Sequence, residues 1–227
     1  MTGTIPLFVD RIDRPEILSN DLTVETLYIS PINEINWSSV RPRRGGVIFY
    51  TDYNGEKIFG FGISRKNGNI TDFGGWIRYP KDHSAINGTY REFQEESYGA
   101  FSVTKEMLTS SPAIVSNVSL EIFIPAPYDP PHMNNRLSSI IQSVTEKSEI
   151  ADIIWLTSKQ LLTRLGDLKY DIHPRIRQVL IYAYLKYGDL ERYLFSNRVQ
   201  FSTLSDIEGS PSSVDAKYHE HSSEPIV

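Results

Sequence analysis

The chain contains no cysteine among its 227 residues. This absence excludes disulfide bonds, thiolate zinc sites and cysteine nucleophiles, and it fits a reducing compartment. No apolar run approaches the roughly 20 residues that a membrane-spanning helix needs. The first residues also lack a basic stretch followed by an apolar core, so we predict no secretory signal. We therefore expect a soluble, intracellular protein of the cytoplasm that does not bind membranes.

Positive charge is in deficit, because 23 Lys and Arg face 28 Asp and Glu and give a net charge of -5. A broad basic surface for duplex nucleic acid is therefore not expected. A local basic groove stays open as an interpretation, because two short basic groups are present: Arg41, Arg43 and Arg44, and Arg175 and Arg177. Composition is otherwise ordinary for a globular protein, with a hydrophobic fraction of 40%, and no pattern indicates the oligomeric state.

The apolar pattern predicts one domain between two less regular ends. We interpret residues 1–21 as a lead-in, 22–200 as the domain and 201–227 as a disordered tail poor in apolar residues. Strands are predicted over 22–30, 47–50, 57–63, 70–73, 113–115, 118–124 and 150–156, and helices over 84–97, 135–146, 158–165 and 174–187. This order indicates an α+β fold or an α/β/α sandwich rather than a regular βαβ series.

Three glutamates share one face of the predicted helix over 84–97. Glu92, Glu95 and Glu96 stand at i, i+3 and i+4, so their side chains leave the helix together. Like charges at this spacing weaken a helix, and a bound divalent cation such as Mg2+ would offset that cost. A solvated acidic face is the commoner meaning of such a stretch. The strand end at Gly74-Gly75 favours the metal, because a strand, loop and helix in this order can hold a pyrophosphate.

The segment Arg91-Glu92-Phe93-Gln94-Glu95-Glu96 resembles the centre of the Nudix box, G-x5-E-x7-R-E-U-x-E-E-x-G-U, in which U is a bulky apolar residue. Asp72-Phe73-Gly74-Gly75 is similar to the strand end that opens the box, and 153–161 to the late strand, tryptophan and helix of the fold. The resemblance implies a Nudix-like α/β/α sandwich with a mixed β-sheet and Mg2+ or Mn2+ as cofactor. It also implies hydrolysis of a pyrophosphate bond in a nucleoside diphosphate linked to another moiety.

The centre of the box is intact, and both of its flanks differ. His83 stands where the family has glutamate, and Ile77 stands where it has glycine, two residues after Gly75. The loop before the helix is therefore longer than the pattern. The closing glycine, Gly99, also comes one residue late.

Roles follow from the resemblance position by position. Glu95 and Glu96 match the main metal ligands of the family, and Glu92 matches a glutamate that binds metal or deprotonates the attacking water. Arg91 matches a residue that braces the helix and loop, and Gly75 or Gly74 is the candidate to lend a backbone carbonyl to the metal.

A further acidic ligand often comes from a later loop in such proteins. Glu149, six residues before Trp155, is the candidate here. A surface glutamate is at least as good an interpretation of this position, and Glu121, within a predicted strand, is a weaker alternative.

The substrate would meet the lengthened loop. An aromatic ring there can stack on a base and cations can meet phosphates, which makes candidates of Trp76, Arg78, Tyr79 and Lys81. Packing of this loop onto the sheet has about equal weight. Phe59 is a further candidate for a base pocket, although core packing is the better interpretation for at least one of Phe59 and Phe61.

Several substrates and two other classes of protein stay open. Similar proteins act on nucleotide sugars, dinucleoside polyphosphates, diphosphoinositol phosphates, oxidised nucleotides or capped messenger RNA, so the expected partner is a nucleotide-derived molecule or RNA. The first alternative class is a catalytically inactive Nudix-fold module that binds or regulates nucleotides or RNA. The second is an unrelated protein with an acidic helix.

Overall fold

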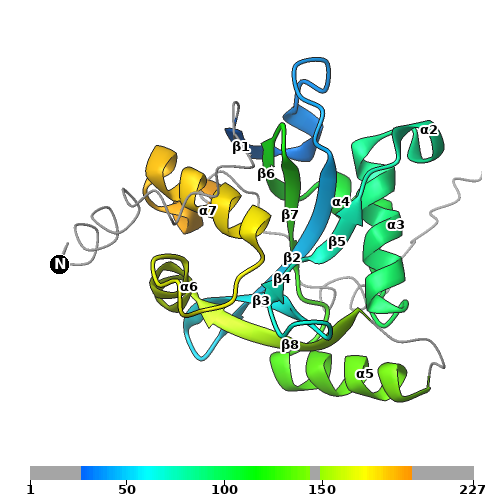
Figure 1. The fold of residues 1–227 in the computed structure, drawn as a ribbon, viewed down its shortest axis with the longest axis vertical. Helices are drawn as coiled ribbons and strands as arrows, with labels where there is room; N and C mark the ends of the chain where they lie inside the picture. The colour runs from blue at the N-terminus through cyan, green and yellow to red at the C-terminus, as the bar shows by residue number, and fades with distance from the viewer. Residues whose placement is uncertain (1–26, 144–148, 196–227) are drawn as a thin grey trace, which may run out of the picture. The chain divides into compact units, whose positions relative to one another are not determined.

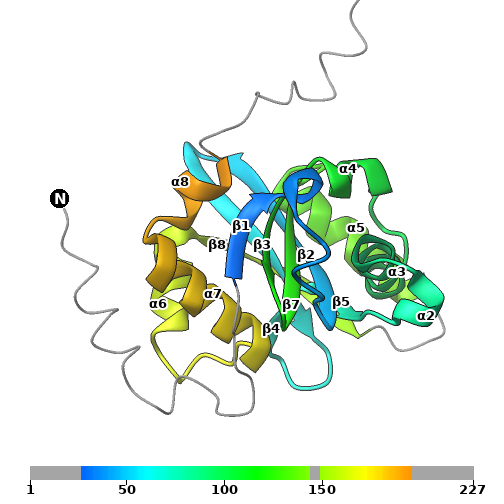
Figure 2. The same ribbon diagram turned by 90° about the horizontal axis from the view of Figure 1, so that it is seen from above.

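The computed structural model describes residues 27–143 and 149–195, which build one eight-stranded sheet with helices on both faces (Figures 1 and 2). The predicted lead-in over 1–21 and tail over 201–227 lie outside the described residues, so the domain limits remain predictions. Within the described residues, no helix is both long enough and apolar enough to cross a membrane.

The sheet is mixed. Its main path runs β1-β6-β7-β2-β3-β4, with β5 paired to β2 and β8 to β3. The pairing of β2 with β7 is parallel, and the other pairings between these strands are antiparallel. The strands are β1 Leu27–Pro31, β2 Arg44–Tyr53, β3 Glu56–Ser64, β4 Ile70–Thr71, β5 Phe73–Trp76, β6 Pro112–Ser116, β7 Ser119–Pro125 and β8 Ile150–Thr157.

Helices cover both faces of the sheet. One face carries α2 Tyr79–Asp82, α3 Ala85–Ser97, α4 Lys105–Thr109 and α5 Pro130–Ser143. The other carries α6 Ser158–Leu165, α7 Pro174–Tyr187 and α8 Leu190–Phe195, as Figure 2 shows. A short 3-10 helix, η1 Ile32–Glu34, follows β1. The predicted α+β class and α/β/α sandwich with a mixed β-sheet are confirmed.

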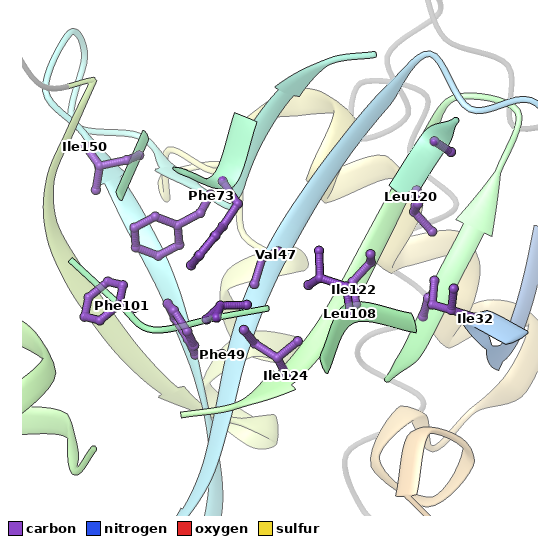
Figure 3. Packing of buried hydrophobic residues seen from close by; sticks show 14 of the residues in the cluster. Ile32, Val47, Phe49, Phe73, Phe101, Leu108, Leu120, Ile122, Ile124 and Ile150 are labelled. Atoms are coloured by element: carbon purple, nitrogen blue, oxygen red, sulfur yellow. The ribbon is translucent and has the colours of Figure 1, made fainter. Parts of the chain in front are cut away.

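Each face of the sheet has its own apolar core. Successive side chains of a strand point to opposite faces, so Val47 and Phe49 of β2 join the core under α3, while Ile48 joins the core under α7. In the α3 core, the ring of Phe49 packs edge-on against Phe73 and Phe101 (Figure 3). These rings fix β2 and β5 beneath α3, the helix that carries the glutamates.

Local signals set the element ends. The Ser84 hydroxyl accepts from the Asn87 amide at 3.1 Å and begins α3, and Thr157 begins α6 with a reciprocal capping box. Asn54 and Gly55 have φ angles of 52° and 79°, which confirms the hairpin that their sequence favours between β2 and β3. The predicted helix over 174–187 is confirmed at both ends.

Other boundaries were wrong. The predicted strand over 70–73 is interrupted at Asp72 and continues as β5 through both glycines to Trp76. The helix expected from 135 begins at Pro130, because the fixed φ of proline suits the first turn. The short helices α2, α4 and α8 were not predicted, since four to six residues are too few to show helical periodicity.

Glycines let α3 lie close to the sheet. A Cβ atom on Gly45 of β2 would lie 1.9 Å from Thr89 Oγ1, and one on Gly75 of β5 would lie 2.1 Å from Glu92 Oε2. No real Cβ makes such contacts, so larger residues at these positions would push α3 away. The short distance between helix and sheet places the glutamates of α3 against the backbone of β5.

Candidate active site

Arg91 ties the acidic face of α3 to the loop that precedes it. Its Nε and Nη2 atoms donate to the two carboxylate oxygens of Asp82 at 2.8 and 3.0 Å. Nη2 also donates to the backbone carbonyl of Trp76 at 3.0 Å. On the other side, Nη1 donates to Glu92 at 2.6 Å and to Glu95 at 3.1 Å. One side chain therefore sets the loop, α2 and two glutamates relative to one another.

Glu92 and Glu95 differ in exposure. The Glu92 side chain is 12% exposed and lies against Gly75, whereas the Glu95 side chain is 56% exposed. Both accept from Arg91, but only Glu92 lines the pocket described below. The acidic helix face predicted from spacing is present, and Glu95 on its outer side contacts Arg91 and solvent.

Glu96 is partly buried against the backbone of β5. Its Oε2 atom accepts from the Gly74 amide at 2.8 Å. Burial raises the pKa of Glu96 to about 9, and the nearby carboxylates of Asp72 and Glu149 add to this rise. Positive charge around Glu96 is too weak to offset its burial, so a cation at this position would be strongly favoured.

Beneath Glu96 lies a buried polar network centred on Arg44. The Arg44 guanidinium donates to both oxygens of Asp72 and, through Nη2, to the Gly74 carbonyl at 2.6 Å. Glu121 Oε1 lies 4.0 Å from Arg44 Nη1 and accepts from the Ser119 hydroxyl. The backbone of Gly74 is thus held on both sides, because Arg44 donates to its carbonyl oxygen and its amide donates to Glu96.

The pKa values of the two buried carboxylates in this network are shifted in opposite directions. Burial pushes the pKa of Asp72 upward, but the charge and hydrogen bonds of Arg44 outweigh it and hold the pKa below its usual value. Burial and the Asp72 charge raise the pKa of Glu121 well above its usual value. Asp72 therefore loses its proton more readily than Glu121 and is the carboxylate that pairs with Arg44 as an anion.

These elements enclose a pocket of about 340 Å³. Acidic side chains come from α3 and from the residue before β8, aromatic and glycine surfaces from β5, and cations from the β5–α2 loop and the start of α7. The lining residues are Arg44, Ser64, Asn67, Asn69, Thr71, Gly74, Gly75, Trp76, Arg78, Glu92, Glu96, Glu149, Ile150, His173 and Arg175.

The structure brings six of the predicted site residues into this one pocket: Gly75, Trp76, Arg78, Glu92, Glu96 and Glu149. Trp76 is 52% exposed there, which is unusual for so large an apolar side chain, and the Arg175 guanidinium lies 4.3 Å from its ring centroid. Arg91 lies behind the pocket, holding Glu92. These roles remain proposals, because placement alone does not test them.

The other candidates lie elsewhere. Phe59 is only 2% exposed and packs against Phe123 in the α7 core, so the predicted place in a base pocket is corrected to core packing. The Tyr79 hydroxyl donates to the Pro42 carbonyl at 2.8 Å and its ring lies under Arg41, which engages Tyr79 in packing of the loop. Lys81 is exposed on α2, and neither Lys81 nor Glu95 lines the pocket.

Sequence reasoning missed several residues of the site. The carboxylate that pairs with Arg91 is Asp82, one residue before the position that the box pattern assigns to His83. His83 instead ends α2 with a left-handed φ of 63°. Arg44, Asp72, His173 and Arg175 gave no local signal, apart from the basic character of the arginines, because contacts across the fold bring them to the site.

A divalent cation fits the chemistry of this pocket. Hard cations such as Mg2+ and Mn2+ prefer carboxylate and carbonyl oxygens, and three carboxylates line the pocket beside the Gly74-Gly75 backbone. Burial raises the pKa of Glu96 to about 9, so its ionised form needs a compensating positive charge, which a bound cation would supply. Within residues 27–143 and 149–195, however, no three Asp, Glu or His side chains are grouped closely enough to hold one ion together. The pull of Arg91 on Glu92 and Glu95 accounts for part of this separation.

Comparisons with known proteins gave matches among solved structures alone. No protein-family model matches the chain, and no curated protein matches it. The structural matches include a Caenorhabditis elegans Ap4A hydrolase in a binary complex, with 15% identity over 66% of this chain and 100% of that one, at a TM-score of 0.38.

Two further matches are Nudix proteins by description. The Nudix domain of Shewanella oneidensis NrtR, complexed with ADP ribose, has 10% identity over 67% of this chain and 94% of that one, at a TM-score of 0.33. A Listeria monocytogenes protein assigned to the Nudix hydrolases has 15% identity over 66% and 97%, also at 0.33. With TM-scores this low, the substrate and the residue roles depend on the site itself.

Proposed function

We propose that the chain is a divalent-metal-dependent hydrolase that cleaves a pyrophosphate bond in a nucleotide-derived substrate. The observation that carries the proposal is the convergence of Glu92, Glu96 and Glu149 on one pocket, beside a glycine backbone and an exposed tryptophan. The first two glutamates come from α3 and the glycines and tryptophan from β5, while Glu149 comes from the residue before β8, more than 50 positions later in the sequence.

Glu96, Glu149 and the carbonyl of Gly75 are the groups that would hold Mg2+ or Mn2+, with Glu92 beside them. A bound cation of this kind neutralises diphosphate oxygens and lowers the pKa of a water molecule. The chain itself keeps Glu96 in place through the Gly74 amide, at 2.8 Å, and keeps that peptide in place through Arg44. These contacts set the position of Glu96 before substrate arrives.

Glu92 is the group that would accept the proton of the attacking water. Arg91 holds its Oε1 atom at 2.6 Å, and its Oε2 atom faces Gly75. A positioned carboxylate contributes typically 10²–10⁴-fold as a general base. Arg91 acts through Glu92 and through Asp82, so it is a positioning residue.

Trp76 and Arg78 would bind the nucleotide part. The Trp76 ring is exposed at the pocket edge and can stack on a base. Arg78 is exposed beside it and can pair with phosphate oxygens.

The proposal is tested by phosphate release from a panel of pyrophosphate compounds, including nucleotide sugars, dinucleoside polyphosphates and capped RNA, with Mg2+ or Mn2+. We expect turnover of at least one compound, lost on metal chelation. Glu92→Gln and Glu96→Gln should each lower kcat by about 100-fold or more. Glu106→Gln, an exposed glutamate on α4, is the matched control and should leave kcat unchanged. Turnover that survives both pocket substitutions would refute the assignment.

A second candidate function is a nucleotide- or RNA-binding module without catalysis. The separation of the carboxylates in the described residues favours it, because Arg91 already engages Glu92 and Glu95. It predicts that one member of the panel binds tightly in calorimetry while none is cleaved with either metal.

A further inference from the structure

Three cations near the pocket have no acidic partner in the part of the chain that the structure describes. Within the described residues, Arg44 and Arg91 form ion pairs, whereas Arg43, Arg78 and Arg175 form none. Arg78 and Arg175 line the pocket. A cluster of like charges without partners costs free energy, and a bound anion removes that cost.

Of these three arginines, Arg175 is the best placed to bind an anion. It lies in the first turn of α7 with its guanidinium 4.3 Å from the ring centroid of Trp76, the residue proposed to stack on a base. Burial lowers the pKa of Arg175, and the positive charges of Arg44 and Arg43 lower it further. The local field at Arg175 is thus positive even though the whole chain is acidic. Arginine presents a planar fork that suits phosphate oxygens.

His173 adds a hydrogen-bonding group to the same edge. It lines the pocket, and its buried Nδ1 atom has no hydrogen-bond partner among the described residues. Its backbone amide is already engaged by the Ile70 carbonyl at 2.8 Å, so its position is fixed. Burial and the charge of Arg44 lower its pKa, which makes it a neutral donor at pH 7.

The acidic and basic parts of the pocket come from opposite faces of the sheet. Glu92 and Glu96 belong to α3 on one face, and Arg175 belongs to α7 on the other, as Figure 2 shows. A phosphate chain has the charge to meet a cation held by the carboxylates in one part and Arg175 in the other. If the bond that is cut lies at the carboxylates, a further phosphate is the group that would reach Arg175.

We propose that Arg175, with His173 and Arg78, binds a phosphate beyond the pyrophosphate bond that is cut, so that the preferred substrate is a nucleoside carrying a chain of three or more phosphates. This inference rests on the proposed function for the position of the bond that is cut. It separates the chain from hydrolases of two-phosphate compounds such as nucleotide sugars. The phosphate subsite itself is an anion site between β5 and α7, and binding of an anion there does not depend on catalysis.

The first test compares two substrates that differ only in phosphate number, diadenosine diphosphate and diadenosine tetraphosphate. Arg175→Gln should raise KM for the tetraphosphate by about tenfold or more and change KM for the diphosphate by less than about threefold, with kcat kept within about threefold for both. Arg192→Gln, an exposed arginine on α8, is the matched control and should change neither. An equal effect on both substrates, or none on either, overturns the inference.

The second test needs no turnover. Calorimetry with Mg2+ measures binding of adenosine triphosphate and diphosphate analogues whose bridging oxygens are replaced by methylene groups. Wild type should bind the triphosphate analogue more tightly than the diphosphate analogue, and Arg175→Gln should remove about tenfold of that preference. If this result appears while no substrate is cleaved, the proposed function fails and the subsite stands. If cleavage occurs while wild type shows no preference, or Arg175→Gln keeps it, the subsite fails and the function stands.

Discussion

Arg91 and Asp82 form a two-point ion pair, with Nε 2.8 Å from Oδ1 and Nη2 3.0 Å from Oδ2. Both side chains are largely buried, at 17% and 4% exposure. The Arg78 amide donates to the same carboxylate at 2.7 Å. Asp82 therefore closes α2 onto α3 and fixes the direction from which Arg91 meets Glu92.

Asp82→Asn should lower both stability and activity. The amide keeps the size of the side chain but removes the charge that Arg91 faces, at a cost of about 1–3 kcal/mol for a hydrogen bond to a charged group. With Glu92 less well held, kcat should fall by about tenfold. Thermal melting and turnover assays measure the two effects. Asp52→Asn is the control, because the ion pair of Asp52 with Lys57 leaves Asp52 76% exposed and contributes little.

The stability effect of Asp82→Asn should depend on pH. The hydrogen bond from Arg91 holds the pKa of Asp82 below its usual value. Because this pKa is lower in the folded state, the ionised carboxylate stabilises the fold at pH values above the usual aspartate pKa of about 3.9. This contribution disappears as pH falls through the lowered pKa. The Tm difference between wild type and Asp82→Asn should therefore be constant from neutral pH down to about 5 and shrink below about 4. A difference that does not change with pH would contradict this account.

Prediction from sequence succeeded where the signal was local. The helix that carries Glu92 and Glu96 could be predicted because Ser84 caps it and its polar and apolar residues follow one period. The hairpin at Asn54-Gly55 and the long helix from Pro174 were local in the same sense. In each case the deciding residues lie within a few positions of one another.

Prediction failed where interacting residues are distant in sequence, and where a turn changes the spacing between a motif residue and its partner. Arg44 and Asp72 lie 28 positions apart and meet because β2 pairs with β5. The α2 turn, with the left-handed φ of His83 at its end, moves the acidic partner of Arg91 to Asp82. A fixed spacing pattern cannot detect either event, because both depend on the backbone path.

Glu96→Gln should stabilise the metal-free protein while removing activity. The pKa of Glu96 is raised to about 9 by burial and by neighbouring carboxylates. The folded state therefore binds a proton more tightly than the unfolded state, and stability falls as pH rises from about 4.5 toward 9. A neutral amide avoids this loss and can still accept from Gly74. In chelator, Tm of Glu96→Gln should exceed that of wild type by roughly 3 °C or more at pH 8.

Bound metal should reverse the order of the two melting temperatures. A ligand that binds only the folded state raises Tm by mass action, so Mn2+ should raise Tm of wild type and have little effect on Glu96→Gln. Melting curves at pH 8, with chelator or with Mn2+, provide the comparison. Equal Mn2+ shifts in the two proteins would show that Glu96 does not contribute to a metal site.

Gly75→Ala should harm the site more than the fold. The added Cβ would lie 2.1 Å from Glu92 Oε2 and 2.6 Å from its Cδ, so the carboxylate must move away from β5. We expect kcat to fall by about tenfold or more, because a displacement near 1 Å is enough to cost that much. Gly55→Ala is the control: its φ is +79° with open space around it, so it should cost about 1 kcal/mol of stability without changing kcat. Equal activity of Gly75→Ala and wild type would mean that the position of Glu92 is not critical.

Arg44→Gln should be the most destabilising of these changes. Arg44 is 6% exposed, and both Asp72 and Glu121 are fully buried. Removing the cation leaves the Asp72 carboxylate buried without a partner, at a cost of about 3–5 kcal/mol. The double substitution Arg44→Gln with Asp72→Asn should recover part of this loss, because it removes the charge as well. Chemical denaturation of the two single variants and the double variant gives the coupling between them, and additive effects would contradict the pairing.

Glu121→Gln separates the two carboxylates of the same network. Burial and the Asp72 charge raise the pKa of Glu121 well above its usual value, so we expect the wild-type side chain to keep its proton. A neutral amide of the same shape should then change stability by less than about 1 kcal/mol, whereas Asp72→Asn removes the anion that Arg44 requires and should cost about 3 kcal/mol. If Glu121→Gln were as costly as Asp72→Asn, both carboxylates would be ionised around one guanidinium. Arg44 would then have to be shared between two anions, and its hold on the Gly74 peptide beneath Glu96 would be weaker than the single pair with Asp72 allows.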